Sequence, residues 1–510
     1  MMPRRNFLKQ AGVAAASEMA LRAADANTIV VDPQPRFEIS PWLYMQFMEP
    51  LGATDGSVEA AWDYDIDDWR KDFVGLTQDL SPDVVRFGGL LSRYYKWREG
   101  VGPPAQRPWM RNYEWGGKET NRVGTGEFVD FCRRVNAAPL YCVNFLGDGV
   151  QAYRHTPEGD RTGDAQEAAD WVSYANDPDH PLRRAHGHPA PYSIALWQIG
   201  NETSYGEATF PRERAIERTT EFARAMRARD PRVQLIGWGD SGWAGPLVQH
   251  AGEYIDWVAV HMMQQRPLRK DTVLDSLAYQ RTPERAWEEL HELLPVRVER
   301  KLLALEAQLD DARSQHPIAV TEGHLSLAPR NVNPLLTEWL VGAYYARQLN
   351  LYARHGARLR MCTAADFNGT RWTSNAVLHE MPRGISYLLP AGAVMRLYKR
   401  HRGTHGVSVR NAPSALDVAA SRRGNDIVLH VANLSYSEGI EADFVVDGMA
   451  VNSGEVFEIA PEDPRAAATS SNPNVFDARR QSLPEGPVVR WRFPARSVSA
   501  VVLRGLPVNA

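Results

Sequence analysis

Residues 194–202 read Ile-Ala-Leu-Trp-Gln-Ile-Gly-Asn-Glu, and this stretch decides the fold that we predict for the chain. A short apolar run is followed at once by a glycine, an amide and a carboxylate. Continuous apolar runs of about four to eight residues are typical of strands that are buried on both faces, as in parallel sheets. A second run of this kind, Ile318-Ala319-Val320-Thr321, is followed by Glu322. We therefore expect two buried strands that lead to two glutamates, Glu202 and Glu322.

Further runs of this type occur along the chain, and longer amphipathic stretches separate them. The alternation of short β-branched or aromatic runs with helical periodicity predicts parallel strands covered by helices. Eight such strands close a (β/α)8 barrel. The predicted strands are 43–48, 84–87, 140–145, 194–199, 233–238, 257–262, 318–321 and 359–365, and the predicted helices are 65–79, 126–135, 212–229, 283–309 and 334–355.

The C-terminal part of the chain has a different pattern. Short alternating strands such as 426–432 and 497–503 are separated there by Gly, Pro, Asn and Ser, which is typical of an antiparallel sandwich. We therefore predict an α/β fold in which a (β/α)8 TIM barrel occupies residues 40–392. Residues 27–39 and 393–510 are predicted to form a C-terminal antiparallel β-sandwich domain of the jelly-roll type.

The first 26 residues are predicted to be a twin-arginine export signal. Arg4-Arg5-Asn6-Phe7-Leu8-Lys9 precedes an Ala-rich apolar stretch, and Ala24-Asp25-Ala26 offers a small-x-small cleavage site. We therefore expect residues 1–26 to direct the protein to the periplasm or the medium. A basic N-terminus without a signal function is the alternative. No run approaches the ~18 apolar residues of a membrane span, so no membrane partner is expected.

The composition excludes several classes of function. With 44% hydrophobic residues, 24% charged residues and a net charge of -4, the chain gives no sign of disorder or of a nucleic-acid partner. Cys132, Cys142 and Cys362 are too widely spaced for a zinc or redox CxxC motif. His186-Gly187-His188 is not accompanied by an HExxH motif, and the glycine pairs are too short for a phosphate-binding loop. We therefore predict neither a metal nor a cofactor.

Polar residues lie at or just after the ends of all of the predicted barrel strands. Active sites of these barrels are built at the carboxyl ends of the strands, so these residues are the candidates for a site. A polar set of this size suits a polyhydroxylated ligand, and we predict a carbohydrate substrate. Any single member is equally explained as a helix cap or a loop residue. The residues are Glu49, Arg86, Asn144, Asn201 with Glu202, Asp240, His261, Glu322 and Asp366.

Glu202 and Glu322, after the fourth and seventh strands, are expected to face each other across one pocket. A retaining glycoside hydrolase needs such a pair, with about 5–5.5 Å between the carboxyl groups. One carboxylic acid protonates the leaving oxygen, and the other forms a covalent glycosyl intermediate. The acid requires a raised pKa, and the nucleophile has to remain ionised. The pattern therefore predicts glycoside hydrolysis by double displacement.

Asn-Glu after strand four and Glu after strand seven resemble the signature of clan A glycoside hydrolases, and four other stretches resemble glycoside hydrolase family 51 within it. That family consists mainly of α-L-arabinofuranosidases. The resemblance runs from about residue 27 to the C-terminus and implies that Glu202 is the acid/base and Glu322 the nucleophile. The four stretches are Ile39-Ser40-Pro41-Trp42-Leu43-Tyr44-Met45-Gln46-Phe47-Met48-Glu49-Pro50-Leu51-Gly52, Trp97-Arg98-Glu99-Gly100-Val101-Gly102-Pro103, Glu119-Thr120-Asn121-Arg122-Val123-Gly124-Thr125 and Phe493-Pro494-Ala495-Arg496-Ser497-Val498.

The same resemblance implies roles for five further residues. Asn201 would bond a substrate hydroxyl, and Glu49 would bind ring hydroxyls. Arg86 would lie near Glu322 and help to keep it ionised. Trp97 would form an apolar wall of the sugar pocket, and His261 stands where the family has a site histidine. A core aromatic and a structural ion pair are the alternatives for Trp97 and Arg86.

The chain departs from the family pattern around the sugar pocket. Phe87-Gly88-Gly89-Leu90 replaces Pro-Gly-Gly-Asn, and Met263 replaces a tyrosine that would contact the nucleophile. His324 lies in a segment that replaces a Glu-Trp-Asn-x-Trp pattern, and Asp366 stands where the family has a glutamine. Because sites that hydrogen-bond a hydroxyl discriminate strongly between sugars, these changes could redirect specificity. We expect His324 and Asp366, with Asn144, to contact the substrate.

Three functions therefore remain in view. The first is an exo-acting α-L-arabinofuranosidase-like enzyme that acts on plant or microbial polysaccharides or oligosaccharides. The second is a glycosidase of the same scaffold for another sugar, such as a galactofuranosidase, a xylosidase or an endoglucanase. The third, from another class, is a non-catalytic carbohydrate-binding protein. Family members often form homo-oligomers, so the resemblance implies a second copy of the chain as a possible partner, and nothing in the sequence tests this.

Overall fold

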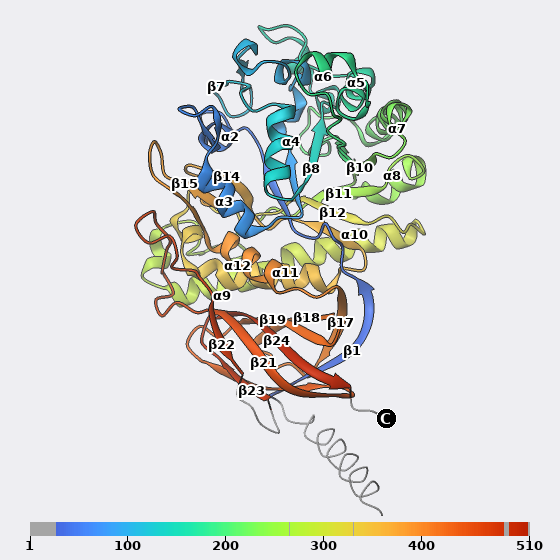
Figure 1. The fold of residues 1–510 in the computed structure, drawn as a ribbon. Coiled ribbons are helices and arrows are strands. Elements are labelled where there is room, and N and C mark those ends of the chain that lie inside the picture. The colour runs from blue at the N-terminus through green and yellow to red at the C-terminus, as the bar shows by residue number, and fades with distance from the viewer. Residues whose placement is uncertain (1–26, 265, 330, 484–488, 508–510) are drawn as a thin grey trace, which may run out of the picture.

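The structure is a computed structural model that describes residues 27–264, 266–329, 331–483 and 489–507 (Figure 1). The predicted export signal, residues 1–26, lies outside the described residues. Two parts are visible, a barrel surrounded by helices and a β-sheet region below it. Every helix in the described part of the chain is too short or too polar to cross a membrane.

Eight parallel strands form the barrel, which confirms the predicted fold class. Their side chains are nearly all buried, because helices cover the outside and side chains fill the inside. A bridge between Tyr44 and Cys362 joins the first strand to the last, so the ring closes. The strands are β2 (Met45–Met48), β5 (Val84–Phe87), β8 (Ala138–Val143), β9 (Leu196–Ile199), β10 (Gln234–Trp238), β11 (Trp257–His261), β12 (Ile318–Glu322) and β13 (Leu359–Cys362).

The helices that cover the barrel match the predicted segments with three differences. The predicted helix 65–79 begins only at Lys71, and the predicted helix 334–355 opens with two 3-10 turns, so that its α-helix begins at Gly342. The predicted helix 283–309 divides into two α-helices on either side of a π-helical turn, Leu294–Glu299. Pro295 lies in this turn, and a proline has no N–H to donate and clashes with the preceding turn of a regular helix. The helices are α2 (Ser57–Ala61), α3 (Lys71–Leu80), α4 (Thr125–Arg134), α5 (Ala165–Asn176), α6 (Pro181–Ala185), α7 (Arg212–Arg229), α8 (Ala244–Ala251), α9 (Pro283–Leu293), α10 (Arg300–Asp311), α11 (Gly342–Arg354) and α12 (Pro390–Arg400).

The second part is a nine-stranded, mainly antiparallel sheet that folds around its own apolar core. The N-terminal strand pairs with β17 and β20 in this sheet, and Figure 1 shows it beside β17. The boundary that we predicted after residue 392 falls within α12. The strands are β1 (Thr28–Glu38), β17 (His405–Arg410), β18 (Leu416–Arg423), β19 (Asp426–Asn433), β20 (Ile440–Val446), β21 (Met449–Ile459), β22 (Arg479–Ser482), β23 (Val489–Phe493) and β24 (Val498–Pro507).

Helices α11 and α12 separate this sheet from the barrel strands (Figure 1). Two indole N–H groups cross the seam: Trp287 donates to the Leu434 carbonyl at 2.8 Å, and Trp339 donates to the Arg496 carbonyl at 2.9 Å. Buried indole groups that find a partner in this way fix the two parts relative to each other.

The loops that follow the barrel strands carry small elements of their own. The loop after β5 contains one hairpin, and the loop after β13 contains a three-stranded sheet. These loops surround the carboxyl ends of the strands, where a site is expected. The additional strands are β3 (Trp62–Asp63), β4 (Asp68–Trp69), β6 (Met110–Arg111), β7 (Lys118–Glu119), β14 (Asp366–Gly369), β15 (Asn375–His379) and β16 (Ser386–Leu388).

Candidate active site

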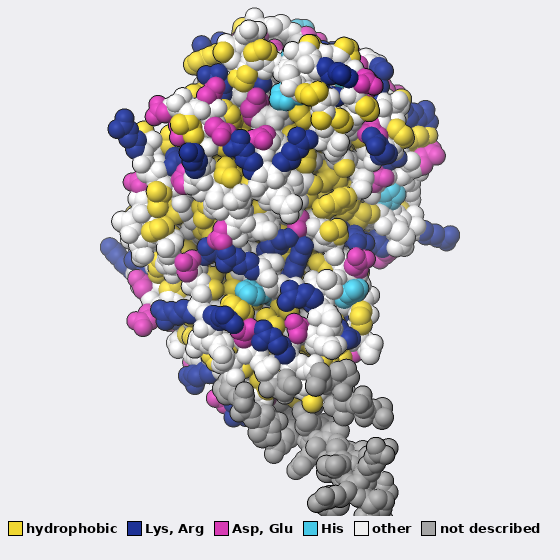
Figure 2. All heavy atoms as spheres, in the orientation of Figure 1, with side chains coloured by type: hydrophobic (Ala, Val, Ile, Leu, Met, Phe, Trp, Pro, Cys, Tyr) yellow, Lys and Arg dark blue, Asp and Glu magenta, His cyan; other side chains and the backbone are white. Residues whose placement is uncertain are grey.

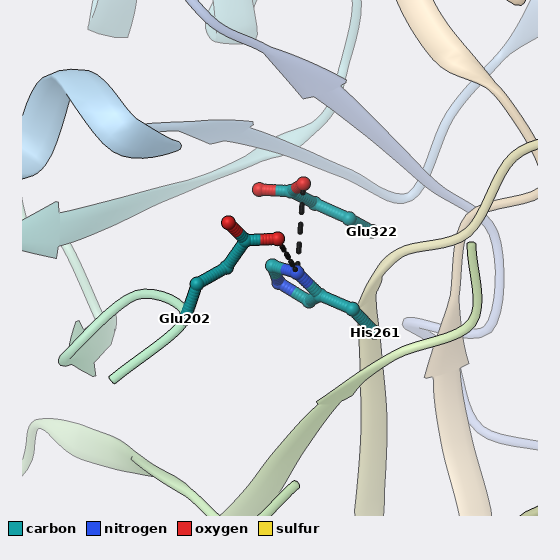
Figure 3. A group of neighbouring side chains, drawn as sticks. All are labelled: Glu202, His261 and Glu322. Atoms are coloured by element: carbon teal, nitrogen blue, oxygen red, sulfur yellow. Dashed lines mark hydrogen bonds and ion pairs between the residues drawn. The ribbon is translucent and has the colours of Figure 1, made fainter. Parts of the chain in front are cut away.

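Glu202, His261 and Glu322 come together at the carboxyl ends of the barrel strands (Figure 3). Glu322 ends β12, His261 ends β11, and Glu202 lies in the loop after β9. The His261 ring contacts both carboxylates: Nδ1 is 3.0 Å from Glu202 Oε1 and 3.5 Å from Glu322 Oε2. The two glutamates therefore share one site, as the sequence predicts. Figure 2 shows one outer face of the molecule, where Lys and Arg side chains are interspersed with Asp and Glu side chains.

The separation of the two carboxyl groups bears on the type of reaction. One oxygen of Glu202, one oxygen of Glu322 and one ring nitrogen of His261 all lie within 4.8 Å of one another. Retaining glycosidases hold their carboxyl groups about 5–5.5 Å apart, whereas inverting enzymes leave about 6.5–9.5 Å for a water molecule. The observed spacing fits the retaining arrangement.

Arg86, at the end of β5, organises the floor of this site. Its guanidinium donates to Glu322 Oε1 at 3.0 Å, to Asn201 Oδ1 at 2.6 Å and to Gln198 Oε1 at 2.8 Å. The Arg86 side chain is fully buried. The predicted contact between Arg86 and Glu322 is thus present, and the planar fork of the guanidinium fixes the directions of all three acceptors.

Asn201 offers a hydrogen-bond donor to the site. Its Oδ1 is held by Arg86, and its buried Nδ2 has no partner among the described residues. An unpaired buried donor is costly, and in a binding site a ligand can supply the missing acceptor. This geometry agrees with the predicted contact between Asn201 and a substrate hydroxyl.

The three titratable groups of the site affect one another. Burial raises the pKa of Glu322 well above its ordinary value, and Arg86 opposes this effect. Burial also raises the pKa of Glu202, but the hydrogen bond and charge of His261, with Arg93 and Arg86, leave that pKa lowered. Burial lowers the pKa of His261 to about 4.

These directions are the reverse of the expected acid at Glu202 and ionised nucleophile at Glu322. Two causes act: burial raises the pKa of Glu322, and the contact of Glu202 with His261 helps to lower the pKa of Glu202. Two carboxyl groups this close share a proton rather than titrate separately.

Glu49, predicted to bind ring hydroxyls, lies on the Glu202 side of the site. Its Oε1 accepts hydrogen bonds from Leu91 N and Trp115 Nε1, both at 3.1 Å. Burial raises the pKa of Glu49 to about 8, and these hydrogen bonds together with Arg86 oppose it, while the neighbouring Glu202 raises it further. A Cβ at Gly89 would lie 2.3 Å from the Glu49 carboxyl group, so this close approach requires a glycine.

His324 and Asp366 form a buried ion pair, with 3.0 Å between Nδ1 and Oδ1. Burial lowers the pKa of His324, but the nearby Asp366 carboxylate outweighs it, and the net pKa is raised. Glu322 and Glu202 also raise it, so the imidazolium lies within electrostatic range of both glutamates. His324 and Asp366, which both differ from the family pattern, therefore contact each other.

Trp97 and Asn144, two of the predicted substrate contacts, have other partners in the structure. Trp97 is buried, its ring packs against Trp171 and Tyr174, and its indole N–H donates to the Glu167 carbonyl. This environment is that of the alternative, a core aromatic. Asn144 donates to two backbone carbonyls and accepts from the N–H of a third residue, so its amide is used to hold a loop. A polar residue at a strand end can have this role because the N–H and C=O groups of a buried loop need hydrogen-bond partners.

Lys301, Asp148 and Arg93 were not predicted as site residues, whereas Asp240 was named among the strand-end candidates. Asp240 accepts hydrogen bonds from the Lys301 side chain at 2.7 Å and from the backbone N–H of His261 at 3.1 Å. Lys301 also donates to the backbone carbonyl of His261 at 2.7 Å. Asp240 was visible as a strand end, but Lys301 lies on helix α10, and no sequence pattern connects the two. Asp148 and Arg93, which hold the loop of Glu202, come from other loops for which no motif gave a signal.

The Glu202–His261–Glu322 group is also the only set of side chains in the described ranges whose ligand atoms are close enough to hold a metal ion. His186 and His188 do not belong to such a set. The guanidinium of Arg86, 3.0 Å from Glu322, already supplies a positive charge at this group. A bound cation would therefore compete with Arg86 for Glu322.

Comparison with known proteins agrees with the predicted resemblance. The family model described as the α-L-arabinofuranosidase 1 domain matches residues 76–281. An intracellular exo-α-(1→5)-L-arabinofuranosidase from Halalkalibacterium halodurans is 31% identical over 46% of this chain and 48% of its own length. A probable α-L-arabinofuranosidase C from Aspergillus niger is 29% identical over 51% of this chain and 54% of its own. The chain thus spans about half the length of the curated relatives that it matches.

Solved structures share the fold over almost the whole chain. The α-L-arabinofuranosidase from Thermotoga maritima in complex with arabinose has a TM-score of 0.77 at 24% identity and covers 94% of this chain and 100% of its own. The family 51 α-L-arabinofuranosidase from Thermotoga petrophila has a TM-score of 0.76 at 24% identity, over 93% of this chain and 99% of its own. A family 44 xyloglucanase from Paenibacillus polymyxa has a TM-score of 0.61 at 13% identity, over 94% and 99%. The resemblance to α-L-arabinofuranosidases of glycoside hydrolase family 51 is therefore confirmed.

Proposed function

We propose that this protein is a retaining glycoside hydrolase that removes terminal α-L-arabinofuranosyl groups from plant or microbial polysaccharides or oligosaccharides. The observation that carries the proposal is the pair of carboxylates, Glu202 and Glu322, within 4.8 Å of each other at the carboxyl ends of the barrel strands. The sequence similarity to α-L-arabinofuranosidases supports the choice of sugar.

The proposed reaction has two steps. In the first, Glu322 attacks the anomeric carbon while Glu202 gives its proton to the leaving oxygen, and a glycosyl ester forms on Glu322. In the second, Glu202 takes a proton from water, and the water oxygen displaces Glu322 from the anomeric carbon. The two inversions restore the original configuration, and both carboxyl groups return to their starting states.

The first step requires the shared proton on Glu202. A sugar that enters between the carboxyl groups covers Glu202, whose side chain is 13% exposed, and desolvation raises its pKa. Arg86 remains bonded to Glu322 and favours the ionised form there. Both effects move the proton towards Glu202, which is the arrangement that the reaction needs.

A panel of aryl glycosides tests the proposal, followed by proton NMR of the first-formed anomer. We expect cleavage of the α-L-arabinofuranoside with the retained anomer formed first. Prompt formation of the inverted anomer would contradict the double-displacement mechanism. The absence of cleavage of every glycoside in the panel would support the alternative of a carbohydrate-binding protein.

A second candidate is a retaining hydrolase for another furanoside or for a pyranoside. The His324–Asp366 ion pair favours it, because a charged donor and acceptor replace groups with a different hydrogen-bonding pattern. The same panel separates the two candidates. Cleavage of a galactofuranoside or a xyloside in preference to the arabinofuranoside would favour the second.

We also propose that the protein is exported through the twin-arginine pathway. The Arg4-Arg5 pair, the Ala-rich stretch and the small-x-small site support this proposal. Replacement of both arginines by lysine should leave the precursor in the cytoplasm of the native host. Equal amounts of the two forms in the periplasm would contradict the proposal.

A further inference from the structure

Glu202 has an unusual backbone conformation. Its φ is +56°, in the left-handed region that side chains other than glycine rarely adopt. The residue lies in an irregular loop after β9, so no ladder of backbone hydrogen bonds holds it there. A conformation of this kind persists only where the surroundings enforce it, and it is common at functional sites.

Asp148 holds the loop on one side of Glu202. Its Oδ1 accepts hydrogen bonds from the Asn201 N–H at 3.1 Å and from the Thr203 hydroxyl at 2.6 Å. The Asp148 side chain is 1% exposed, and its own φ is +52°. One carboxylate oxygen thus connects the residues immediately before and after Glu202.

Arg93 holds the same segment through its carbonyl groups. Its Nη2 donates to the Glu202 carbonyl at 3.2 Å and to the Asn201 carbonyl at 3.4 Å. Its Nε lies 3.4 Å from Asp148 Oδ2, so the two side chains form a buried ion pair. Together they contact the peptide groups on both sides of the Glu202 Cα.

Glu322 is positioned by different contacts. It ends a regular barrel strand, β12, and is bonded to Arg86. Asp148 and Arg93 direct their hydrogen bonds to the segment 201–203 instead. Arg86 also bonds Asn201, next to Glu202, but the contacts of Asp148 and Arg93 go to the segment of the proposed acid and not to the proposed nucleophile.

We propose that the Asp148–Arg93 pair is a positioning device for the proton donor: it holds Glu202 in its left-handed conformation and so directs the carboxylic acid at the leaving oxygen. This inference rests on the proposed function, in which Glu202 protonates the leaving group. Loss of the pair lets the segment 201–203 relax, which displaces the acid and leaves Glu322 in place. A displacement of about 1 Å is enough to cost about 100-fold in rate.

The consequence is a selective defect. A glycoside with a poor leaving group, such as a benzyl glycoside, needs the proton from Glu202. A 2,4-dinitrophenyl glycoside does not need it, because 2,4-dinitrophenolate departs as a stable anion. The ratio kcat/KM reports the first step alone, in which Glu202 is the acid. Impaired protonation therefore lowers kcat/KM for the benzyl glycoside and spares the dinitrophenyl glycoside.

The test compares Asp148→Asn with wild type on both glycosides of the sugar that wild type cleaves. The introduced amide carries no charge and can turn its NH₂ group towards the Arg93 N–H, so the attraction between the two side chains is lost. We expect kcat/KM to fall about 100-fold for the benzyl glycoside and less than about 3-fold for the dinitrophenyl glycoside. Thr203→Val removes one hydrogen bond to Asp148 and should give about a 10-fold loss with the same selectivity.

Asp83→Asn is the matched control. Asp83 is also a nearly buried carboxylate, with its side chain 8% exposed, and it accepts from Arg402 and from the Tyr44 N–H. It lies just before β5, at the opposite end of the barrel strands. The control should lower the melting temperature as Asp148→Asn does and leave the ratio of kcat/KM for the two glycosides unchanged.

An equal loss on both glycosides in folded Asp148→Asn and Thr203→Val, or a selective loss in the control, would overturn the inference. If Asp148→Asn does not fold, the milder Thr203→Val decides the question alone. If wild type cleaves no dinitrophenyl glycoside of any sugar tested, the proposed function fails, and this inference fails with it. If wild type cleaves the dinitrophenyl glycoside but the variants lose kcat/KM equally on both glycosides, only the positioning role is refuted and the proposed function stands.

Discussion

Glu49→Gln is expected to stabilise the protein at neutral and alkaline pH but not at acid pH. Burial raises the pKa of Glu49 to about 8 from an ordinary value of 4.5, so the folded protein binds this proton more tightly than the unfolded chain. The stability that the protonated carboxyl group contributes is therefore fully present below about pH 4.5. It is lost as the pH rises towards about 8. Glutamine imitates the protonated acid and does not titrate.

The size of the effect follows from the two pKa values. At about 1.4 kcal/mol for each pH unit, the loss in wild type between these limits is about 5 kcal/mol. An entropy of unfolding of about 2.1 cal/mol/K for each residue converts this free energy into about 5 °C of melting temperature for a chain of 510 residues. The amide oxygen of glutamine can still accept from Leu91 N and Trp115 Nε1, so the local contacts are kept.

The assay is the melting temperature of both proteins at half-unit steps from about pH 4.5 to about pH 8.5, the range that the linkage covers. The difference between variant and wild type should grow by about 5 °C across this range and then level off. Glu253→Gln, at an exposed position, serves as the control and should show a constant difference. A constant difference for Glu49→Gln, or one that shrinks as the pH rises, would refute the reasoning that Glu49 is held protonated beside Glu202.

Three further predictions concern the same site. Glu322→Ala should lower kcat by at least about 10⁴-fold, as loss of a covalent nucleophile does, and azide should restore turnover with formation of the inverted glycosyl azide; a retained product would contradict the role. Asp366→Asn should lower the melting temperature more at pH 6 than at pH 9. The raised pKa of His324 contributes stability that is fully present below the ordinary pKa of 6.5 and is lost as the pH rises through the pKa of the folded protein. An equal loss of melting temperature at both pH values would refute the ion pair. Trp97→Phe should lower the melting temperature by about 2 °C through lost core packing and leave KM unchanged; a raised KM with unchanged melting temperature would return Trp97 to the sugar pocket.

The fold could be predicted because barrel strands are buried on both faces. Their sequences are mostly apolar, so runs such as 318–321 stand out against the amphipathic helices, and each observed strand begins and ends within a few residues of its predicted bounds. The same property placed Glu322 and Arg86, since a polar residue at the end of such a run has to lie at the strand end. Their contact follows from the closure of the barrel.

The rest of the site depends on contacts that no local pattern encodes. Asn144 and Asn201 both follow barrel strands, yet the first satisfies loop backbone groups and the second offers a free donor. Lys301 reaches Asp240 from a helix, and its sequence context is that of an ordinary surface residue. The aromatic at Trp97 is a core residue because α5 packs over it, and that packing is a property of the assembled fold.

The central claim is that Glu322 forms a covalent bond to the sugar while Glu202 serves as acid and base. Glu202→Ala removes the base of the second step, so an activated dinitrophenyl glycoside should convert this variant to a stable glycosyl enzyme. Mass spectrometry of the intact protein and its peptides then identifies the modified residue. The account predicts one added glycosyl group on the peptide that contains Glu322. A group on any other residue, or unmodified protein that still releases dinitrophenol at the wild-type rate, would contradict it.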